Sequence, residues 1–289
     1  MDIANSGAKW GTSAKRITVR RHTCSWFVAN TKTTDLTLED VTVVARPTFD
    51  QAGTLTINAD GAQIRGCTAR TLAVGQRSAR STRPTVISDC SFALPAGQVL
   101  VQTPVTAPVH FERCVFTGLD GALLRGSGPV RFTGCTLTGA PDAAPLSVGA
   151  ADLTVVGGTL TDTGIDTDTD TGIELSAVRD QRLHLDGTRL TGTNNKKTLL
   201  GRATGPGTIT WQLSGTTSTT GDAGTAHLRI TDGTNHYSAF GCRLSGGTLH
   251  LEPAACADTV HTACVEHDTR RTALPETGPA AHVDGNVHT

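Results

Sequence analysis

The 289-residue sequence is poor in the side chains from which helical proteins and sugar-stacking sites are built. It has one methionine and one tyrosine, and aromatic residues make up 4% of the chain. Helix-favouring Lys, Glu and Met are sparse, whereas β-branched Thr and Val recur along the chain. The composition therefore argues against a helical or α/β enzyme and favours many short strands. The scarcity of aromatic faces also argues against a dedicated sugar-binding cleft, for which Trp10, Trp26 and Tyr237 are the candidate contacts.

An excess of one charge sign is also missing. The chain has 25 Lys plus Arg and 26 Asp plus Glu, so its net charge is −1. Such a chain has no global field that attracts nucleic acid or an anionic membrane. No stretch approaches the roughly 20 apolar residues that span a bilayer, and the N-terminus lacks the basic and apolar regions of a secretion signal. We therefore expect no nucleic-acid partner, no membrane insertion and synthesis in a cytoplasm.

A short sequence repeat, here called the phrase, recurs along the chain instead. Apolar residues alternate with polar ones, a small residue follows, and another apolar residue comes two positions later, as in residues 109–118 and 130–139. Aligned as one column, the small positions are His22, Val41, Cys67, Cys90, Cys114, Cys135, Gly158, Thr188, Ser214 and Cys242. The mean step is (242 − 22)/9, about 24 residues, which is typical of a solenoid repeat. Four cysteines of this column are predicted to be buried, reduced thiols: Cys67, Cys90, Cys114 and Cys135.

The phrase predicts how the coils pack. One coil cannot bury its apolar face alone, so neighbouring coils must stack on it, about 4.8 Å apart. Phe111 and Phe132 then share one inward column, and Phe92, Phe116 and Leu137 share another. An antiparallel β-sandwich is the competing fold, but it does not explain a repeat that recurs over more than two hundred residues.

This phrase, with coils of uneven length and long inserts, resembles the right-handed parallel β-helix superfamily, which includes pectate lyases, polygalacturonases, bacteriophage tailspikes and bacterial adhesins. The resemblance implies an all-β fold: a right-handed parallel β-helix, or solenoid, of about ten coils at residues 16–251. Residues 1–15 are expected to form an N-terminal flank or cap, and residues 252–289 a C-terminal cap and extended tail. Caps or partner subunits must cover the open strand edges at both ends.

The insert at residues 161–176 is the first candidate site. Asp166, Asp168 and Asp170 alternate in it, as the carboxylates at the start of a calcium loop do. The match is partial, because Thr171 and Ala177 stand where an EF-hand has glycine and glutamate. A solvated acidic loop and an acid/base pair for glycoside cleavage are the alternatives. No cofactor is expected, apart from a calcium ion if these carboxylates hold one.

The motifs of β-helix enzymes are missing. The chain has none of the Asn-Thr-Asp, Asp-Asp and Gly-His-Gly motifs in which polygalacturonases resemble one another. Arg77, Arg80 and Arg83 offer an arginine such as pectate lyases use, but no acidic partner aligns with them, so an exposed basic turn is expected. The sequence thus favours a non-catalytic role and leaves enzymatic activity open.

Two motifs near the C-terminus have competing interpretations. Cys256 and Cys264 could form a disulfide, bind zinc or remain buried thiols; the zinc ligands would come from His250, His261 and His267. Residues 274–278 spell the sortase signal Leu-Pro-Glu-Thr-Gly, but the hydrophobic segment and basic tail that the signal requires do not follow. A chance match or an engineered tag explains it better.

The resemblance, the missing enzyme motifs and the open ends together favour a structural virion protein of a bacteriophage, either a tailspike, a tail fibre or a minor tail component, that contributes to host-surface attachment. Its expected partners are two further copies in a homotrimer, other virion proteins and a host-surface glycan, and its expected location is the virion, assembled in the host cytoplasm. The alternatives are a polysaccharide lyase or glycoside hydrolase on a β-helix, and a bacterial cell-surface adhesin.

Overall fold

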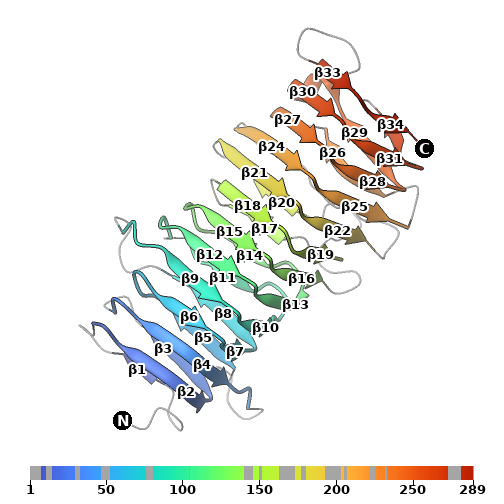
Figure 1. The fold of residues 1–289 in the computed structure, drawn as a ribbon. Coiled ribbons are helices and arrows are strands. Elements are labelled where there is room, and N and C mark those ends of the chain that lie inside the picture. Colours follow the sequence, from blue (N-terminus) through green and yellow to red (C-terminus); the bar gives the residue numbers. More distant parts are fainter. Residues whose placement is uncertain are drawn as a thin grey trace.

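The computed structural model describes residues 8–10, 15–29, 33–46, 53–75, 81–103, 105–139, 146–149, 152–162, 173–176, 180–192, 203–204, 207–221, 225–231, 233–272 and 281–288. This part of the chain is all β, with no α-helix and a single 3₁₀ turn at Pro253–Ala255. None of it forms a helix that is long and apolar enough to cross a membrane. Every strand pairing in it is parallel, so the strands stack as a solenoid does, with the two termini at opposite ends of the stack (Figure 1).

Twelve strands form a first ladder that runs through the described chain. They are β2 (Thr18–Cys24), β4 (Thr37–Val43), β6 (Gln63–Arg65), β9 (Thr85–Ser88), β12 (Val109–Glu112), β15 (Val130–Thr133), β18 (Asp152–Val156), β21 (Gln181–Asp186), β24 (Thr208–Ser214), β27 (Thr234–Phe240), β30 (Cys256–Thr262) and β33 (Ala281–Asp284).

A second ladder follows the first directly along each coil. Its ten strands are β7 (Thr68–Ala69), β10 (Ser91–Ala93), β13 (Val115–Leu119), β16 (Thr136–Gly139), β19 (Thr159–Thr161), β22 (Arg189–Gly192), β25 (Thr217–Thr220), β28 (Arg243–Ser245), β31 (Val265–His267) and β34 (Val287–His288). In the first coils β2 and β4 are long enough to occupy both ladders, which joins the two into one 22-stranded sheet.

A third ladder closes the coils. Nine of its strands form one sheet: β1 (Ala8–Trp10), β3 (Trp26–Ala29), β5 (Thr54–Ile57), β8 (Thr71–Val74), β11 (Val99–Val101), β14 (Leu123–Leu124), β17 (Leu146–Val148), β20 (Ile173–Ser176) and β23 (Ala203–Thr204). In the last coils β26 (Ala226–Ile230), β29 (Thr248–Leu251) and β32 (Arg270–Thr272) form a separate three-stranded sheet.

Every coil bends between the first and second ladders at a residue with positive φ, from 47° to 64°. These residues are Arg21, Asp40, Gly66, Asp89, Arg113, Gly134, Gly157, Gly187, Gly215, Gly241, Ala263 and Gly285. The left-handed conformation turns the chain sharply, and glycine adopts it without steric cost, which accounts for seven of the twelve. The next residue in each coil points into the interior, and these residues stack as one column, the bend column.

The bend column agrees with the predicted column except at one position. Thr216, not Ser214, lies beside Thr188 and Cys242, because β24 runs on to Ser214 and Gly215 makes the bend. The column also continues through Cys264 and Asn286. The strands therefore run past residue 251, where the repeat was expected to end, and β1 lies in the expected N-terminal flank.

Side chains of the bend column hydrogen-bond to the backbone of neighbouring coils. The Cys67 amide donates to the Cys90 Sγ at 3.2 Å, and the Thr188 hydroxyl donates to the Val155 carbonyl at 3.2 Å. Asn286 accepts from the Cys264 amide at 2.9 Å. A sharp bend turns backbone groups inward, and buried groups of this kind need partners. Small side chains that can both donate and accept serve that purpose, and all eight cysteines are free thiols.

The predicted aromatic columns are confirmed. Phe111 stacks on Phe132 with ring centroids 4.8 Å apart, and Phe92 stacks on Phe116 at 5.4 Å. Phe116 also meets Phe111 edge to face at 5.4 Å, which joins the two columns across the interior. Leu137 pairs with Phe116 in the next coil, as expected. These buried rings fix the register, because a slip by one residue would turn them outward.

Candidate functional site

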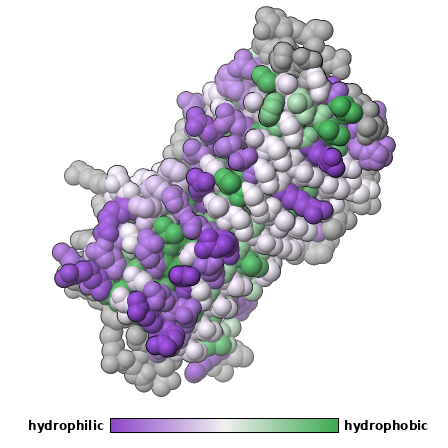
Figure 2. Space-filling view, in the orientation of Figure 1, coloured by the Kyte–Doolittle hydropathy of each residue, from purple (hydrophilic) through white to green (hydrophobic). Residues whose placement is uncertain are grey.

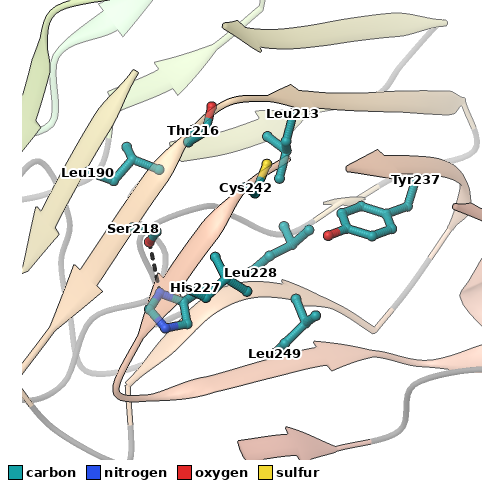
Figure 3. Close-up of a pocket in the computed structure, with 10 residues that line it drawn as sticks. Leu190, Leu213, Thr216, Ser218, His227, Leu228, Tyr237, Cys242 and Leu249 are labelled. Carbon is teal, nitrogen blue, oxygen red and sulfur yellow. Dashed lines mark hydrogen bonds between the residues drawn. The ribbon is translucent and has the colours of Figure 1, made fainter. Parts of the chain in front are cut away.

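The buried polar residues of the last coils form two clusters. The first begins at Ser218, which lies in an inward column of the second ladder. Its neighbours in that column are Leu190 in the preceding coil and Leu244 in the following one. His227 faces Ser218 from β26, on the opposite wall of the same coil (Figure 3). Both side chains are buried.

The Ser218 hydroxyl lies 2.8 Å from the His227 Nδ1. The His227 Nε2 lies 2.6 Å from the Gly246 carbonyl oxygen, which can only accept, so Nε2 carries the proton and Nδ1 accepts from Ser218. Burial lowers the pKa of His227 to about 4, against the opposing effects of the Gly246 carbonyl and of Glu266. The imidazole is therefore neutral at pH 7 and hydrogen-bonded at both nitrogens.

A small cavity lies beside this pair, lined mainly by leucines together with Thr216, Tyr237 and Cys242 (Figure 3). Its volume is about 10 Å³, at the lower limit for one water molecule. A serine next to a neutral imidazole is the start of a nucleophilic site, but such a site also needs room for a substrate and donors for the developing oxyanion. This cavity has no room for a substrate, so the Ser218–His227 pair acts as a hydrogen-bonded part of the core.

The second cluster lies two coils further on and contains charge. The Glu266 carboxylate accepts from the His261 Nε2 at 2.7 Å and from both Nε and Nη2 of Arg271 at 2.9 Å. The Tyr237 hydroxyl lies 3.0 Å from the His261 Nδ1. The side chains of His261 and Glu266 are 0% and 1% exposed, so these interactions take place away from solvent and are stronger than they would be in water.

The two ionisable partners stabilise each other's charged form. Burial opposes charge on Glu266, but hydrogen bonds and positive charge from His261 and Arg271 lower its pKa to about 2. Burial likewise opposes charge on His261, but hydrogen bonds to Cys264 and Glu266 raise its pKa to about 9. The cluster is therefore a protonated histidine, a carboxylate and a guanidinium at neutral pH. It joins three strands, β30, β31 and β32, of one coil and bonds to Tyr237 in the coil before.

The candidate residues named from the sequence do not form a site in the described part of the chain. Asp166, Asp168 and Asp170 lie outside it, as do Arg77, Arg80 and residues 274–278. Arg83 pairs with the carboxylate of Asp35, an acidic partner that the sequence alone did not identify.

The zinc alternative has no support in the described residues, where no three His, Cys, Asp or Glu side chains come together as a metal site. Cys264 lies in the bend column, and His261 is buried against Glu266. His267 is exposed and pairs with Asp268. Tyr237, one of the three candidate sugar contacts, is buried, because it occupies an inward position of β27.

Sequence reasoning missed both clusters, although a signal for them exists. In the inward column of the second ladder, Leu160, Leu190 and Leu244 are apolar, whereas Ser218 and Glu266 are polar. A polar residue at a position that the repeat makes apolar predicts a buried partner. The partners themselves, His227, His261 and Arg271, come from other walls and are identified only in three dimensions.

No protein-family model matches the chain, and no curated protein and no solved structure is significantly similar to it.

Proposed function

We propose that the chain is a right-handed parallel β-helix that acts as a rigid structural component of a bacteriophage virion and contributes to host-surface attachment. The observation that carries the proposal is the continuity of the parallel ladders, one strand per coil, from β2 to β33. Crossovers between parallel strands of one sheet are right-handed in about 98% of cases, which supports this hand.

A mechanical role fits the way the coils hold one another. Each strand inside a ladder hydrogen-bonds to a strand on either side, so a bending load is spread over many backbone bonds. The largest side chains, including Trp211, Phe111 and Phe116, fill the interior and are less than 2% exposed. A ligand of any size must therefore meet the outer surface. Host attachment through outward side chains and inserts is the role that this arrangement supports best.

Immunogold electron microscopy tests the location. Antibody raised against the full chain is expected to label the tails of phage particles in a lysate of the source culture. Label on the cell envelope with unlabelled particles would replace the virion role with the adhesin alternative. Sedimentation equilibrium tests the proposed trimer, and a monomer at micromolar concentration would contradict it.

A glycan panel separates attachment from catalysis. The purified chain is expected to bind host surface polysaccharide without releasing reducing or unsaturated ends. Release that disappears in Asp166→Ala and Asp168→Ala would instead assign a polysaccharide lyase or glycoside hydrolase. Addition and removal of calcium in the same assay tests whether Asp166, Asp168 and Asp170 hold the ion, which would be expected to strengthen binding.

A further inference from the structure

One outer face of the stack consists almost entirely of threonine. The outward side chains of β16, β19, β22 and β25 are seven threonines and one arginine, Arg189. The threonines are Thr136, Thr138, Thr159, Thr161, Thr191, Thr217 and Thr219, and together these eight residues are called the threonine face. It contains no carboxylate.

The threonine face is in register from coil to coil. Thr136 pairs with Thr159, Thr138 pairs with Thr161, and Thr161 pairs in turn with Thr191. Thr219 completes the second row. No bulge interrupts the pairing between these four strands. The result is two parallel rows of side chains that follow the axis of the stack.

The hydroxyls of the threonine face have no protein partner in the described part of the chain. None of the seven donates to or accepts from another described residue, whereas interior hydroxyls such as that of Thr188 are bonded to carbonyls. All seven threonines are half-buried, and they are neighbours along two rows, so their methyl and hydroxyl groups line one surface. Hydroxyls in this situation must bond to water or to a ligand.

The first ladder provides an internal comparison. In the same coils its outward positions include Arg131, Asp152, Arg182, His184 and Asp186, a mixture of charges that is usual on an exposed sheet. In Figure 2 the surface over the middle coils is mostly pale, and strongly hydrophilic residues gather over the N-terminal coils. Threonine also occurs outward in the first ladder, as at Thr133, Thr154 and Thr210, but there it stands among charged residues. High β-propensity accounts for threonine on any strand, but not for its filling of every outward position except Arg189 on the threonine face.

The backbone fixes the spacing of this surface. Neighbouring coils lie about 4.8 Å apart, and alternate residues of one strand about 6.6 Å apart. Threonine is branched at Cβ and rotates little about χ1, so its hydroxyl and methyl groups hold these positions. The shorter repeat is close to the distance between oxygen atoms along the a axis of hexagonal ice.

We propose that the threonine face binds ordered water and thereby adsorbs to ice. A hydroxyl that binds a ligand gives up a hydrogen bond to liquid water and forms one to the ligand, so the net free energy gained from a single contact is small. A rigid row whose spacing matches a lattice repeat makes all its contacts at once, so their small free energies add. The side chains are already held in place, so little conformational entropy is lost on binding. The face is short and contains Arg189, whose long charged side chain interrupts one row, so a modest activity is expected.

Inhibition of ice recrystallisation by the full chain tests the proposal. The chain is expected to keep crystals small at micromolar concentration, where an equal concentration of albumin does not. Thr138→Lys combined with Thr161→Lys is expected to weaken inhibition about tenfold, because the contacts act together. Thr154→Lys combined with Thr210→Lys, on the outward side of the first ladder, is the matched control and is expected to keep full activity. Arg189→Thr is expected to raise activity by completing the row.

Three results would overturn the proposal. The first is activity no greater than that of albumin, with circular dichroism showing a folded chain. The second is equal loss in the threonine-face and control variants. The third is binding of the chain to microcrystalline cellulose or to a second copy of itself that depends on Thr161, without ice activity; this would assign the face to a polysaccharide or to self-association. None of these outcomes bears on the location or oligomeric state tested above.

Discussion

The coils at residues 85–139 and those at residues 208–272 have the same backbone plan but different interiors. In the first group, here called the apolar coils, the interior holds stacked Phe side chains and three bend-column thiols, Cys90, Cys114 and Cys135. In the second group, the polar coils, inward positions hold Ser218, His227 and Glu266. The comparison shows that the ladders and the bend determine the fold. The interior side chains determine how the stability of each group of coils depends on denaturant and pH.

Apolar and polar interiors stabilise a coil in different ways. Buried aromatic rings stabilise the fold through the apolar area that they remove from water and through contacts between rings. Because they carry no titratable group, a change in pH does not alter this contribution. A buried polar cluster contributes only while every group has its partner. In the polar coils the hydroxyls of Thr225 and Thr262 have none among the described residues. We therefore expect the polar coils to open at lower denaturant concentration than the apolar coils, as a stack with nearest-neighbour coupling allows.

The largest effect is expected from removing a ring in the apolar coils. Phe116→Ala deletes a buried side chain that touches Phe92, Phe111 and Phe132, and should lower the free energy of unfolding by about 4 kcal/mol. Urea unfolding followed by circular dichroism measures it. Val115→Ala, at an exposed neighbouring position, should cost less than about 0.5 kcal/mol. Equal losses in both variants would contradict the described register.

Removing the shared negative charge should have the next largest effect, confined to the polar coils. Glu266→Gln leaves the buried His261 and the half-buried Arg271 without a carboxylate and should cost about 3 kcal/mol. Trp211 fluorescence reports on these coils when Trp10 and Trp26 are replaced by Phe. Glu112→Gln is the control, since its exposed contact with Arg113 should contribute less than about 0.5 kcal/mol. A loss below 1 kcal/mol in Glu266→Gln would mean that water reaches the cluster.

The stability of the polar coils, measured by the same fluorescence signal, should be highest near the ordinary histidine pKa of about 6.5. His261 has a raised pKa, so its contribution is complete below pH 6.5 and is lost as the pH rises through about 9. His227 has a lowered pKa, so the unfolded chain takes up its proton first, and stability falls as the pH drops from 6.5 towards 4. Each limb should amount to about 3 kcal/mol. A flat profile from pH 5 to 9 would show that neither shift exists.

A smaller loss is expected at Ser218. Ser218→Ala leaves the His227 Nδ1 without its donor in the core, at a cost of about 1–2 kcal/mol. Ser245→Ala, one coil further along on the outward side of the second ladder, should have almost no effect. Urea unfolding at pH 7 compares the two variants. If Ser218→Ala were neutral, a water molecule in the adjoining cavity would have to replace the hydroxyl.

The smallest change should come from exchanging residue types within the bend column. Cys135→Thr places at this coil the residue found at Thr188 and Thr216, keeps a donor for the carbonyl that Cys135 contacts, and should cost less than about 1 kcal/mol. Cys135→Val has a similar shape without the donor and should cost about 1–2 kcal/mol. Thermal unfolding distinguishes them. Equal stability of the two variants would show that the column depends on volume alone.

Much of the fold could be predicted because the repeat encodes it twice, in the alternation within a strand and in the step from coil to coil. The columns through Phe92, Phe111, Cys90 and Cys114 follow directly from aligned phrases. The coil of Cys264 escaped notice because its bend residue is Ala263 rather than glycine or a charged residue. Thr216 was displaced by two positions because β24 is longer than the strands used to define the phrase.

The candidate site was harder to predict because its members come from different walls. His261 and Glu266 are close in sequence, but their contact requires the bend at Ala263 to turn β31 back towards the interior. His227 meets Ser218 across the coil, and nothing in the local sequence identifies that partner. The alternating period predicts which residues point inward, but pairing across the interior depends on the lengths of the intervening turns, which vary between coils.

The shared bend has a consequence for how such a molecule can change in size. Each coil begins and ends at an equivalent left-handed residue, and its strands pair only with strands of the adjacent coils. A gene segment that encodes one whole coil can therefore be duplicated or lost, and the remaining coils keep their register. Steps between bends as unequal as 19 and 30 residues already occur in this chain, with the surplus placed in the connections between ladders. Length and surface decoration can thus evolve separately on one scaffold.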